Sequence, residues 1–340
     1  MRFPDFSDQA RPVAAFAMRT ELPHRIFGPS EMSRIHAVAD IDETAVITDF
    51  GAVGRDRLAS ISILITGWGA PAIGAAELDA MPRLRAIIHA GGTVKAHISP
   101  AAWDRGILVT TAAAANAYPV AEYTLAFILL AGKDVPETVR AYARDPAAAA
   151  ADRDDIGNFQ RTVGVISASR IGRRVIQLLE PFDFTVLLYD PNLAVDDPIL
   201  ARAQRTDLDD LLRRSSIVTI HAPLLPETTG LLGREQLAQM RPGATLINTA
   251  RAPIVDQEAL TEAVAAKRLR AILDVTDPEP LPARHPLRRL DGVILTPHVA
   301  GALGNELRRL GQSATREIEL LAAGVPAEHP VTWDSLAAMA

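Results

Sequence analysis

Short runs of apolar, often β-branched residues alternate along the chain with longer segments whose apolar residues recur at helical spacing. This alternation continues from near the start to about residue 300 and is typical of βαβ units, which build a parallel sheet. The runs fall into two series, so the pattern predicts two sheets. The predicted strands lie at residues 13–18, 61–66, 85–90 and 107–111, and then at 162–167, 185–190, 217–222, 244–250, 270–275 and 292–297.

The segments outside these runs are helical or polar. Residues 119–132 predict a buried helix, because this apolar stretch is shorter than the roughly 20 residues of a membrane span and contains Glu122. The alanine-rich residues 144–155 predict an exposed connection, and residues 305–324 predict a helix after the last strand. We therefore expect an α/β fold with two Rossmann-like, doubly wound domains and parallel sheets.

The composition is that of a folded, soluble protein. Of the 340 residues, 48% are hydrophobic and 22% are charged, and a chain of this length usually forms two domains. The formal net charge of −6 gives no general attraction to nucleic acid or to an anionic membrane. Because the chain has no cysteine, disulfides, thiolate metal sites and cysteine nucleophiles are excluded, and a cytoplasmic location is expected.

Residues 1–16 lack the basic start and apolar run of a signal peptide, so we expect no secretion.

The segment TVGVISASRIGRR, residues 162–174, has the strand-to-helix pattern in which dinucleotide-binding enzymes place three glycines. Here the three positions hold Ser167, Ser169 and Gly172, so the segment alone also fits an ordinary strand and helix. Asp190 ends the next strand at roughly the 20-residue offset expected of the carboxylate that binds the adenosine ribose. A carboxylate before Pro191 is also a common turn residue. Together the two features favour NAD, and they disfavour NADP because Asp190 would repel its 2′-phosphate.

Linked motifs follow further along the chain. They read HAPLLPETTGLLG (221–233), MRPGATLINTARAPIVDQEAL (240–260), LDVTDPEPLPARHPL (273–287) and ILTPHVAG (294–301), and NAYPVAEYTLAFILLAGK (116–133) precedes them. In order and spacing they resemble the D-isomer-specific 2-hydroxyacid dehydrogenase family, from about residue 87 to about residue 314. Several linked motifs in order arise by chance far less often than one glycine pattern.

The resemblance implies a catalytic trio of Arg251, Glu279 and His298. Reduction of a 2-keto acid needs a hydride at C2, a proton for the carbonyl oxygen and a cation for the carboxylate. Imidazole exchanges protons near neutral pH, which suits His298 to the proton transfer, and Glu279 would orient its ring. The forked guanidinium of Arg251 suits a carboxylate better than a lysine would. Taken singly, each residue has a plain alternative as a solvated, capping or turn residue.

The same resemblance implies further contacts for cofactor and substrate. Asp274 would bond the nicotinamide carboxamide, with a strand-end cap as the alternative. The other predicted cofactor contacts are Ser169, Arg170, Ile171, Asp190, Ala222, Pro223, Thr228, Thr249 and Ala250. On the substrate side, Gly91, Gly92 and Thr93 would offer backbone N–H groups to a carboxylate that Arg251 also binds.

The chain departs from the family pattern at several positions. Ala252 and Pro253 follow Arg251 where the family usually has glycine next, which would stiffen this loop. Lys95 stands at a normally acidic position of the substrate loop. It is either an extra cation for an anionic substrate or, as we prefer, a structural change that points away from the site. No arrangement of histidines and carboxylates suggests a metal, and the histidines that we interpret as structural are His89, His97 and His221.

These inferences combine into one functional prediction. Residues 1–117, completed by residues 303–340, would bind the substrate, residues 118–302 would bind NAD, and the active site would lie in the cleft between these domains. We expect an NAD-dependent oxidoreductase that interconverts a small D-2-hydroxy acid and its 2-keto acid, as a homodimer formed through the helices after residue 119. The alternative is a dinucleotide-sensing, non-catalytic, corepressor-like protein on the same fold. A third reading, oxidation of a one-carbon or inorganic anion, is disfavoured because the relatives that oxidise formate have glutamine where this chain has Glu279.

Overall fold

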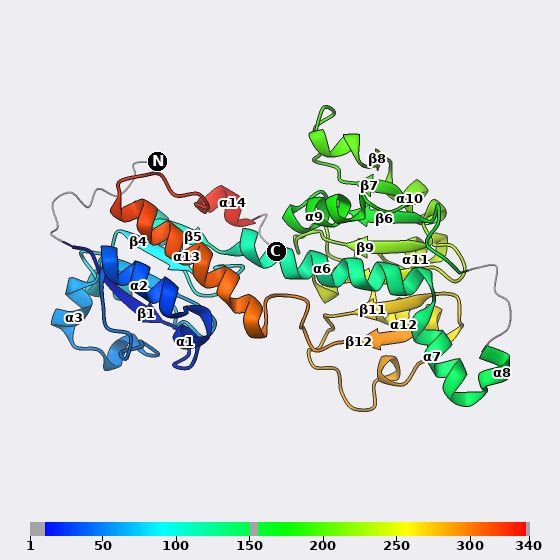
Figure 1. Ribbon diagram of the computed structural model, residues 1–340, viewed down its shortest axis with the longest axis horizontal. Coiled ribbons are helices and arrows are strands. Elements are labelled where there is room, and N and C mark those ends of the chain that lie inside the picture. The colour runs from blue at the N-terminus through cyan, green and yellow to red at the C-terminus, as the bar shows by residue number, and fades with distance from the viewer. Residues whose placement is uncertain (1–10, 150–155, 338–340) are drawn as a thin grey trace. The chain divides into compact units, whose positions relative to one another are not determined.

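The computed structural model describes residues 11–149 and 156–337, and the chain forms two compact units. Unit 1 consists of the chain up to Asn116 and of the segment that starts at Ala302, and unit 2 consists of Ala117–Gly301. Each unit holds one parallel sheet between helices, which confirms the predicted α/β class (Figure 1). The substrate and cofactor roles expected of residues 1–117 with 303–340 and of residues 118–302 stay predictions.

Unit 1 contains a five-stranded parallel sheet in the order β2-β1-β3-β4-β5. Its strands are β1 (Val13–Ala17), β2 (Asp40–Ile41), β3 (Ile63–Thr66), β4 (Ala86–His89) and β5 (Leu108–Thr111). Because successive side chains of a strand point to opposite faces, Ala14 and Phe16 pack on one face and Ala15 and Ala17 on the other. The first face is covered by α1 (Leu22–Ile26), α2 (Pro29–Val38) and α13 (Leu307–Ala322). The second is covered by α3 (Arg55–Ser60), α4 (Ala75–Ala80), α5 (Ala101–Asp104) and α14 (Trp333–Ala337).

Unit 2 contains a seven-stranded parallel sheet in the order β12-β11-β10-β9-β6-β7-β8. Its strands are β6 (Thr162–Ile166), β7 (Thr185–Tyr189), β8 (Gln204–Arg205), β9 (Ile217–Ile220), β10 (Thr245–Asn248), β11 (Arg270–Leu273) and β12 (Val293–Leu295). Strands β7 and β8 follow β6 on one side, and β9 then pairs with β6 on its other side. In such sheets, ligands bind outside the carboxyl ends of the strands where the order reverses, which here are β6 and β9.

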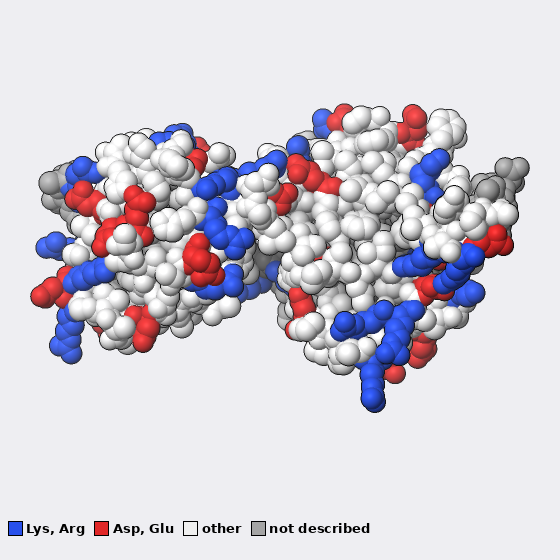
Figure 2. All heavy atoms as spheres, turned by 60° about the horizontal axis from the view of Figure 1, so that its bottom comes forward, with Lys and Arg blue, Asp and Glu red and all other residues white. Residues whose placement is uncertain are grey.

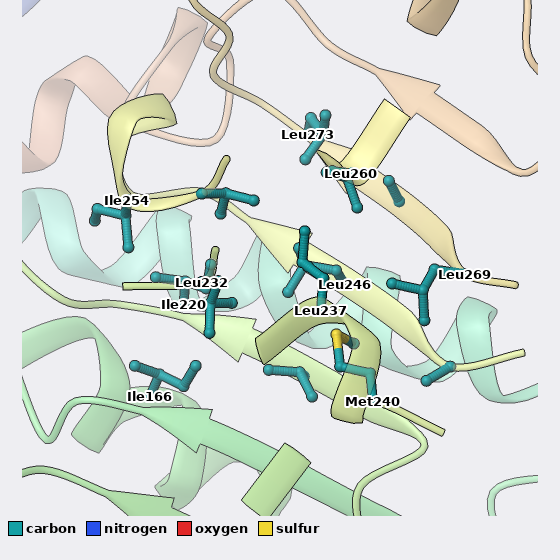
Figure 3. Close-up of a cluster of buried hydrophobic side chains, with 14 of the residues drawn as sticks. Ile166, Ile220, Leu232, Leu237, Met240, Leu246, Ile254, Leu260, Leu269 and Leu273 are labelled. Carbon is teal, nitrogen blue, oxygen red and sulfur yellow. The ribbon is translucent and has the colours of Figure 1, made fainter. Parts of the chain in front are cut away.

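Alternating residues of β6 belong to the two halves of the unit 2 core. Ile166 packs with α10 (Leu208–Arg214), α11 (Arg234–Gln239) and α12 (Gln257–Ala265). Val163 and Val165 pack with α9 (Arg170–Leu179) and α6 (Ala113–Gly132) on the opposite face. Figure 3 shows the first cluster, where Leu237 of α11 lies beside Leu246 of β10. Full burial of each such side chain contributes roughly 1.5–3 kcal/mol to folding, so the two clusters hold the helices on the sheet.

The long helix α6 begins in unit 1 and ends in unit 2. The prediction of a buried helix at residues 119–132 was only partly right. Ala121 and Ile128 pack into the core of unit 2, whereas Leu130 on another face of the helix is 39% exposed. Pro119, which cannot donate a helical hydrogen bond, lies close to the boundary between the units. Among the described residues, α6 is the one helix long and apolar enough to cross a membrane, a test that core helices of soluble proteins also pass.

The structure adds elements that the pattern did not predict. Strands β2 and β8 have two residues each, which is too short for a periodic signal. The connection predicted at residues 144–155 is exposed at residues 144–147, but its start is helical, because α7 (Val135–Arg144) ends there and α8 (Pro146–Ala149) follows. Residues 150–155 lie outside the described residues. Short 3-10 turns are η1 (Phe50–Ala52), η2 (Pro198–Ala201), η3 (Ala252–Ile254), η4 (Pro286–Arg288) and η5 (Gly304–Glu306).

Acidic and basic side chains are interspersed on the faces of both units that Figure 2 shows. Some form close ion pairs, such as Arg34 with Glu319 and Arg173 with Asp197, both at 2.6 Å. Pairs at the surface contribute little to stability, so the hydrophobic clusters remain the main source of stability.

Candidate active site

His298 and Glu279 form a hydrogen-bonded pair in unit 2. Nδ1 of His298 lies 2.9 Å from Oε1 of Glu279, and both side chains are partly exposed. His298 follows β12 and has a φ of +56°, a left-handed conformation that few residues other than glycine adopt. Strained backbone of this kind occurs at many functional sites. Because Nδ1 faces the carboxylate, Nε2 is the ring nitrogen left to exchange a proton with a substrate.

The buried carboxylate of Asp274 holds the loop that carries His298. Its Oδ1 accepts hydrogen bonds from Oγ1 of Thr296 at 2.6 Å and from the N–H of Val299 at 2.8 Å, and its Oδ2 accepts from the N–H of Ala300 at 2.9 Å. The N–H of His298 donates in turn to the carbonyl of Asp274. Asp274 therefore caps the end of its strand, which was the alternative to its predicted bond with the nicotinamide carboxamide. A carboxylate has about four acceptor positions, so one remains for the predicted carboxamide contact, which stays a prediction.

Arg251 lies in the turn after β10 and directly precedes η3. Its carbonyl accepts a hydrogen bond from Nδ2 of Asn248 at 3.0 Å, and its Nη1 donates to the carbonyl of Ala250 at 2.7 Å. Burial lowers the pKa of the Arg251 guanidinium below its usual value, and the negative charge of Glu279 partly offsets this effect. Arginine stays charged in proteins even so. The structure thus places Glu279 in a hydrogen bond with His298 and near enough to Arg251 for its charge to act on the guanidinium, while the catalytic roles of the three residues stay predictions.

The loop between β6 and α9 lies where the strand order reverses. Ser167 has a φ of +80°, the conformation for which glycine is usually needed. Ser169 is the N-cap of α9, and its Oγ accepts a hydrogen bond from the N–H of Gly172 at 3.3 Å. A Cβ atom on Gly172 would lie 2.0 Å from the carbonyl oxygen of Ser167, so only glycine permits this approach of helix and strand. The serines therefore keep the turn that glycines usually form.

The start of α9 has the donors expected of a phosphate site. The N–H groups of Arg170 and Ile171, its first two residues, have no acceptor inside the helix. Such groups and the helix dipole attract phosphate. Because Ser169 already accepts the N–H of Gly172, that N–H is not available to a phosphate. The N–H groups of Arg170 and Ile171 remain as the two donors.

Asp190 follows β7 and faces this loop. Its Oδ2 accepts hydrogen bonds from the N–H of Ala168 at 2.8 Å and from Oγ of Ser167 at 3.2 Å, and its Oδ1 accepts from the N–H of Asn192 at 2.9 Å. Asp190 therefore acts as a turn residue, which was the alternative to its predicted contact with the adenosine ribose. Its carboxylate also lies beside the loop, at the position predicted for that contact. Its contact with a ribose stays a prediction.

The remaining predicted cofactor contacts follow β9 and β10. Ala222 and Pro223 come after β9, and Thr249 and Ala250 come after β10. Ala222, Thr249 and Ala250 are buried, which fits contacts made through their backbone. Oγ1 of Thr228 donates to the carbonyl of Pro223 at 2.6 Å, so this hydroxyl stabilises the turn between the two residues. The predicted place of Thr228 near the phosphates stays a prediction.

The predicted substrate loop with Gly91, Gly92 and Thr93 belongs to unit 1 and follows β4. A Cβ atom on Gly91 would lie 2.5 Å from Nε2 of His89, so the buried imidazole keeps this position free of side chains. Burial lowers the pKa of His89 to about 3, which agrees with the structural role that we gave it. Joint action of this loop with the trio in unit 2 stays a prediction. In the described part of the chain, no group of three or more metal-ligating side chains is placed to hold an ion.

Three residues of this site were not singled out from the sequence. Asn248 holds the backbone of Arg251, Thr296 bonds Asp274, and Oη of Tyr123 lies 2.6 Å from Oγ1 of Thr296. Their signal is weak, because a lone amide or hydroxyl at a strand end or in an apolar helix has many ordinary explanations.

Comparison with known proteins identifies the family. Residues 125–300 match the family model described as "D-isomer specific 2-hydroxyacid dehydrogenase, NAD binding domain". The chain belongs to this family. The resemblance inferred from the motifs is therefore confirmed, and unit 2 contains the NAD-binding domain of a 2-hydroxyacid dehydrogenase.

This chain covers different shares of the similar proteins. A glyoxylate reductase from Thermofilum pendens is 36% identical over 258 residues, which are 72% of this chain and 74% of that protein. A D-3-phosphoglycerate dehydrogenase from Mycobacterium bovis is 33% identical over 256 residues, which are 75% of this chain and 48% of that protein. The chain thus spans about half the length of that relative. The crystal structure of a phosphoglycerate oxidoreductase from Rhizobium etli superposes with a TM-score of 0.80 at 25% identity, covering 96% of this chain and 100% of that one.

The residues of unit 2 fit a nicotinamide dinucleotide, the cofactor of this family. Gly172 leaves the space that a Cβ would fill, the first N–H groups of α9 are placed at the strand reversal, and Asp190 stands beside the loop. The chemistry of these donors and of this carboxylate is that of a site for diphosphate and ribose.

Proposed function

We propose that this 2-hydroxyacid dehydrogenase is an NAD-dependent oxidoreductase that interconverts a small D-2-hydroxy acid and its 2-keto acid. The observation that carries the proposal is the hydrogen-bonded pair of His298 and Glu279 in the NAD-binding unit, with the charge of Glu279 acting on Arg251. Relatives named glyoxylate reductase and D-3-phosphoglycerate dehydrogenase support this substrate class.

Each member of the trio has one task in this reaction. A nicotinamide dinucleotide held by the start of α9 and by Asp190 would supply or accept the hydride. Nε2 of His298 gives a proton to the carbonyl oxygen of the keto acid during reduction and takes it back during oxidation. Glu279 fixes the orientation of the ring. Arg251 binds the substrate carboxylate with two parallel N–H groups and polarises the adjacent carbonyl, while Gly91, Gly92 and Thr93 would bind the same carboxylate through their N–H groups.

NAD rather than NADP is the proposed cofactor. The carboxylate of Asp190 accepts hydrogen bonds from Ser167 and Ala168 in the loop between β6 and α9, which places a negative charge beside that loop. A ribose hydroxyl can donate to such a carboxylate, whereas the 2′-phosphate of NADP would be repelled by it.

We also propose that the protein is a cytoplasmic homodimer. Helix α7 has no buried residue, and its apolar side chains Val139 and Tyr142 are both 62% exposed. Exposed apolar groups gathered on one helix support a protein–protein interface, which we assign to a second copy of the chain. The absence of cysteine is compatible with the cytoplasm.

The function is tested by following NADH oxidation with a panel of 2-keto acids of different size and charge. Calorimetric titrations with NADH and NADPH, which need no substrate, measure cofactor binding separately. We expect NADH to bind more tightly than NADPH and at least one keto acid to be reduced. NADH binding without turnover of any keto acid would instead support the corepressor-like alternative. That alternative also requires a partner whose binding depends on NADH and is unaffected by His298→Ala.

A further inference from the structure

Three polar side chains in series link α6 to the loop that carries His298. Oη of Tyr123, on α6, lies 2.6 Å from Oγ1 of Thr296, and this oxygen lies 2.6 Å from Oδ1 of Asp274. Asp274 in turn accepts the N–H groups of Val299 and Ala300, directly after His298, while its own carbonyl accepts the N–H of His298. Tyr123 is therefore connected to the backbone on both sides of the imidazole.

The direction of these hydrogen bonds follows from the chemistry of the three groups. A carboxylate only accepts, so the hydroxyl of Thr296 must donate its single proton to Asp274. The same oxygen then accepts, and Tyr123 must be the donor. Burial raises the pKa of the Tyr123 phenol above its usual value, so this donor keeps its proton at neutral pH. The two hydrogen bonds thus run in one direction and polarise each other towards Asp274.

Helix α6 is attached to this segment at a second point. Oδ1 of Asn116 accepts a hydrogen bond from the N–H of Ala302 at 2.9 Å, and Ala302 closes the segment that begins at Thr296. Asn116 and Tyr123 lie about two helical turns apart. Helix α6 therefore contacts Ala302 within unit 1 and Thr296 within unit 2, which are the two ends of the segment that contains His298.

From this arrangement we infer that Tyr123 is a positioning residue for His298, acting through Thr296 and Asp274. The inference rests on the proposed oxidoreductase function. The left-handed conformation of His298 costs free energy in a residue other than glycine, so contacts around it must favour it. The hydrogen bonds to Asp274 do so, and Tyr123 supplies the proton that completes their network. Without this donor, the oxygen of Thr296 has lost a partner and the network is weaker.

The first test is Tyr123→Phe, which removes one oxygen and keeps the ring that packs 4.7 Å from the ring of Phe127. We expect kcat to fall about three- to tenfold, the range that one hydrogen bond of this kind controls. The primary isotope effect with deuterated NADH should rise, because the chemical step becomes slower. Calorimetric affinity for NADH should stay unchanged. Thr296→Val should lower kcat further, whereas Thr296→Ser, which keeps the hydroxyl, should restore it.

The matched control is Tyr118→Phe, which removes the same oxygen from the same helix and should change neither kcat nor the isotope effect. A second readout needs no turnover. In protein with ¹³C-labelled histidine, the ring signal of His298, identified through His298→Asn, should shift in Tyr123→Phe and not in Tyr118→Phe.

The two readouts separate the inference from the function on which it rests. If the wild type reduces no keto acid, the proposed function fails while the ring signal still tests the role of Tyr123. If Tyr123→Phe keeps the wild-type kcat, isotope effect and His298 signal, the inference is overturned. Loss of thermal stability with these three quantities unchanged would show a merely structural role and overturn it equally.

Discussion

Replacing His89 by glutamine should make unit 1 less sensitive to acid. His89 is buried at the end of β4, with Nδ1 2.9 Å from Oγ1 of Thr66 and its ring 4.8 Å from that of His97. Burial lowers the pKa of His89 from 6.5 to about 3, and the neighbouring His97 contributes in the same direction. The folded unit keeps this ring neutral where the unfolded chain has already bound a proton. The resulting stability is complete above pH 6.5 and is lost as the pH falls towards 3.

The magnitude follows from this difference in proton binding. At about 1.36 kcal/mol per pH unit, one such histidine costs about 5 kcal/mol of unfolding free energy over the whole range and about 2 kcal/mol between pH 7 and pH 5. These losses are large against the roughly 5–15 kcal/mol that stabilise a typical domain. In His89→Gln the acid-dependent loss of unfolding free energy that His89 causes should disappear. This holds whether or not the substitution changes stability at pH 7.

Tryptophan fluorescence during urea unfolding reports on the correct unit, because Trp68, Trp103 and Trp333 all lie in unit 1. Between pH 7 and pH 5 the unfolding free energy should fall by about 2 kcal/mol less in His89→Gln than in the wild type. His24→Gln changes an exposed histidine of the same unit and should behave as the wild type does. An equal fall in all three proteins would refute the reasoning.

Four further outcomes test the site and the assembly. His298→Asn should lower kcat by about 10²- to 10⁴-fold with NADH binding retained in calorimetry, and wild-type turnover would exclude it as the acid–base group. Asp190→Ser should raise the affinity for NADPH relative to NADH, since a repelling charge is removed; an unchanged ratio contradicts its role. Gly172→Val should abolish NADH binding, because a Cβ would meet a backbone oxygen at 2.0 Å, and circular dichroism shows whether the fold survives. Val139→Glu with Tyr142→Glu should give monomers in analytical ultracentrifugation, and a persistent dimer would place the interface elsewhere.

The strands could be predicted because both sheets are enclosed on two faces. Interior parallel strands are continuous apolar runs, and every predicted run contains a strand. The edge strands β2 and β8 escaped prediction, since two residues carry no periodicity. The start of α6 at Ala113 was missed because its first turns are rich in alanine and Pro119 resembles a helix start. The degree of burial of α6 was misjudged, because an apolar composition does not say which face has a partner.

Part of the site was predictable from the rule that the carboxyl ends of parallel strands meet at one edge. Arg251, Asp274 and His298 follow three neighbouring strands, β10, β11 and β12. The contact of Glu279 with His298 depends on the path of a long loop, for which periodicity gives no information. The link from Tyr123 to Thr296 joins a helix to a distant loop, so only the tertiary structure reveals it.

Unit 1 is assembled from both ends of the chain, and this has a consequence for synthesis on the ribosome. Leu310 and Ile318 of α13 fill the face of the sheet beneath Phe16 and Ile65. The strands emerge early, yet this covering helix is translated only after all of unit 2. Unit 2 is one uninterrupted stretch and can fold as soon as it leaves the exit tunnel. The N-terminal part of unit 1 is therefore synthesised first but completes its folding last. Until α13 is available, it exposes an apolar face of its sheet, a surface that chaperones bind.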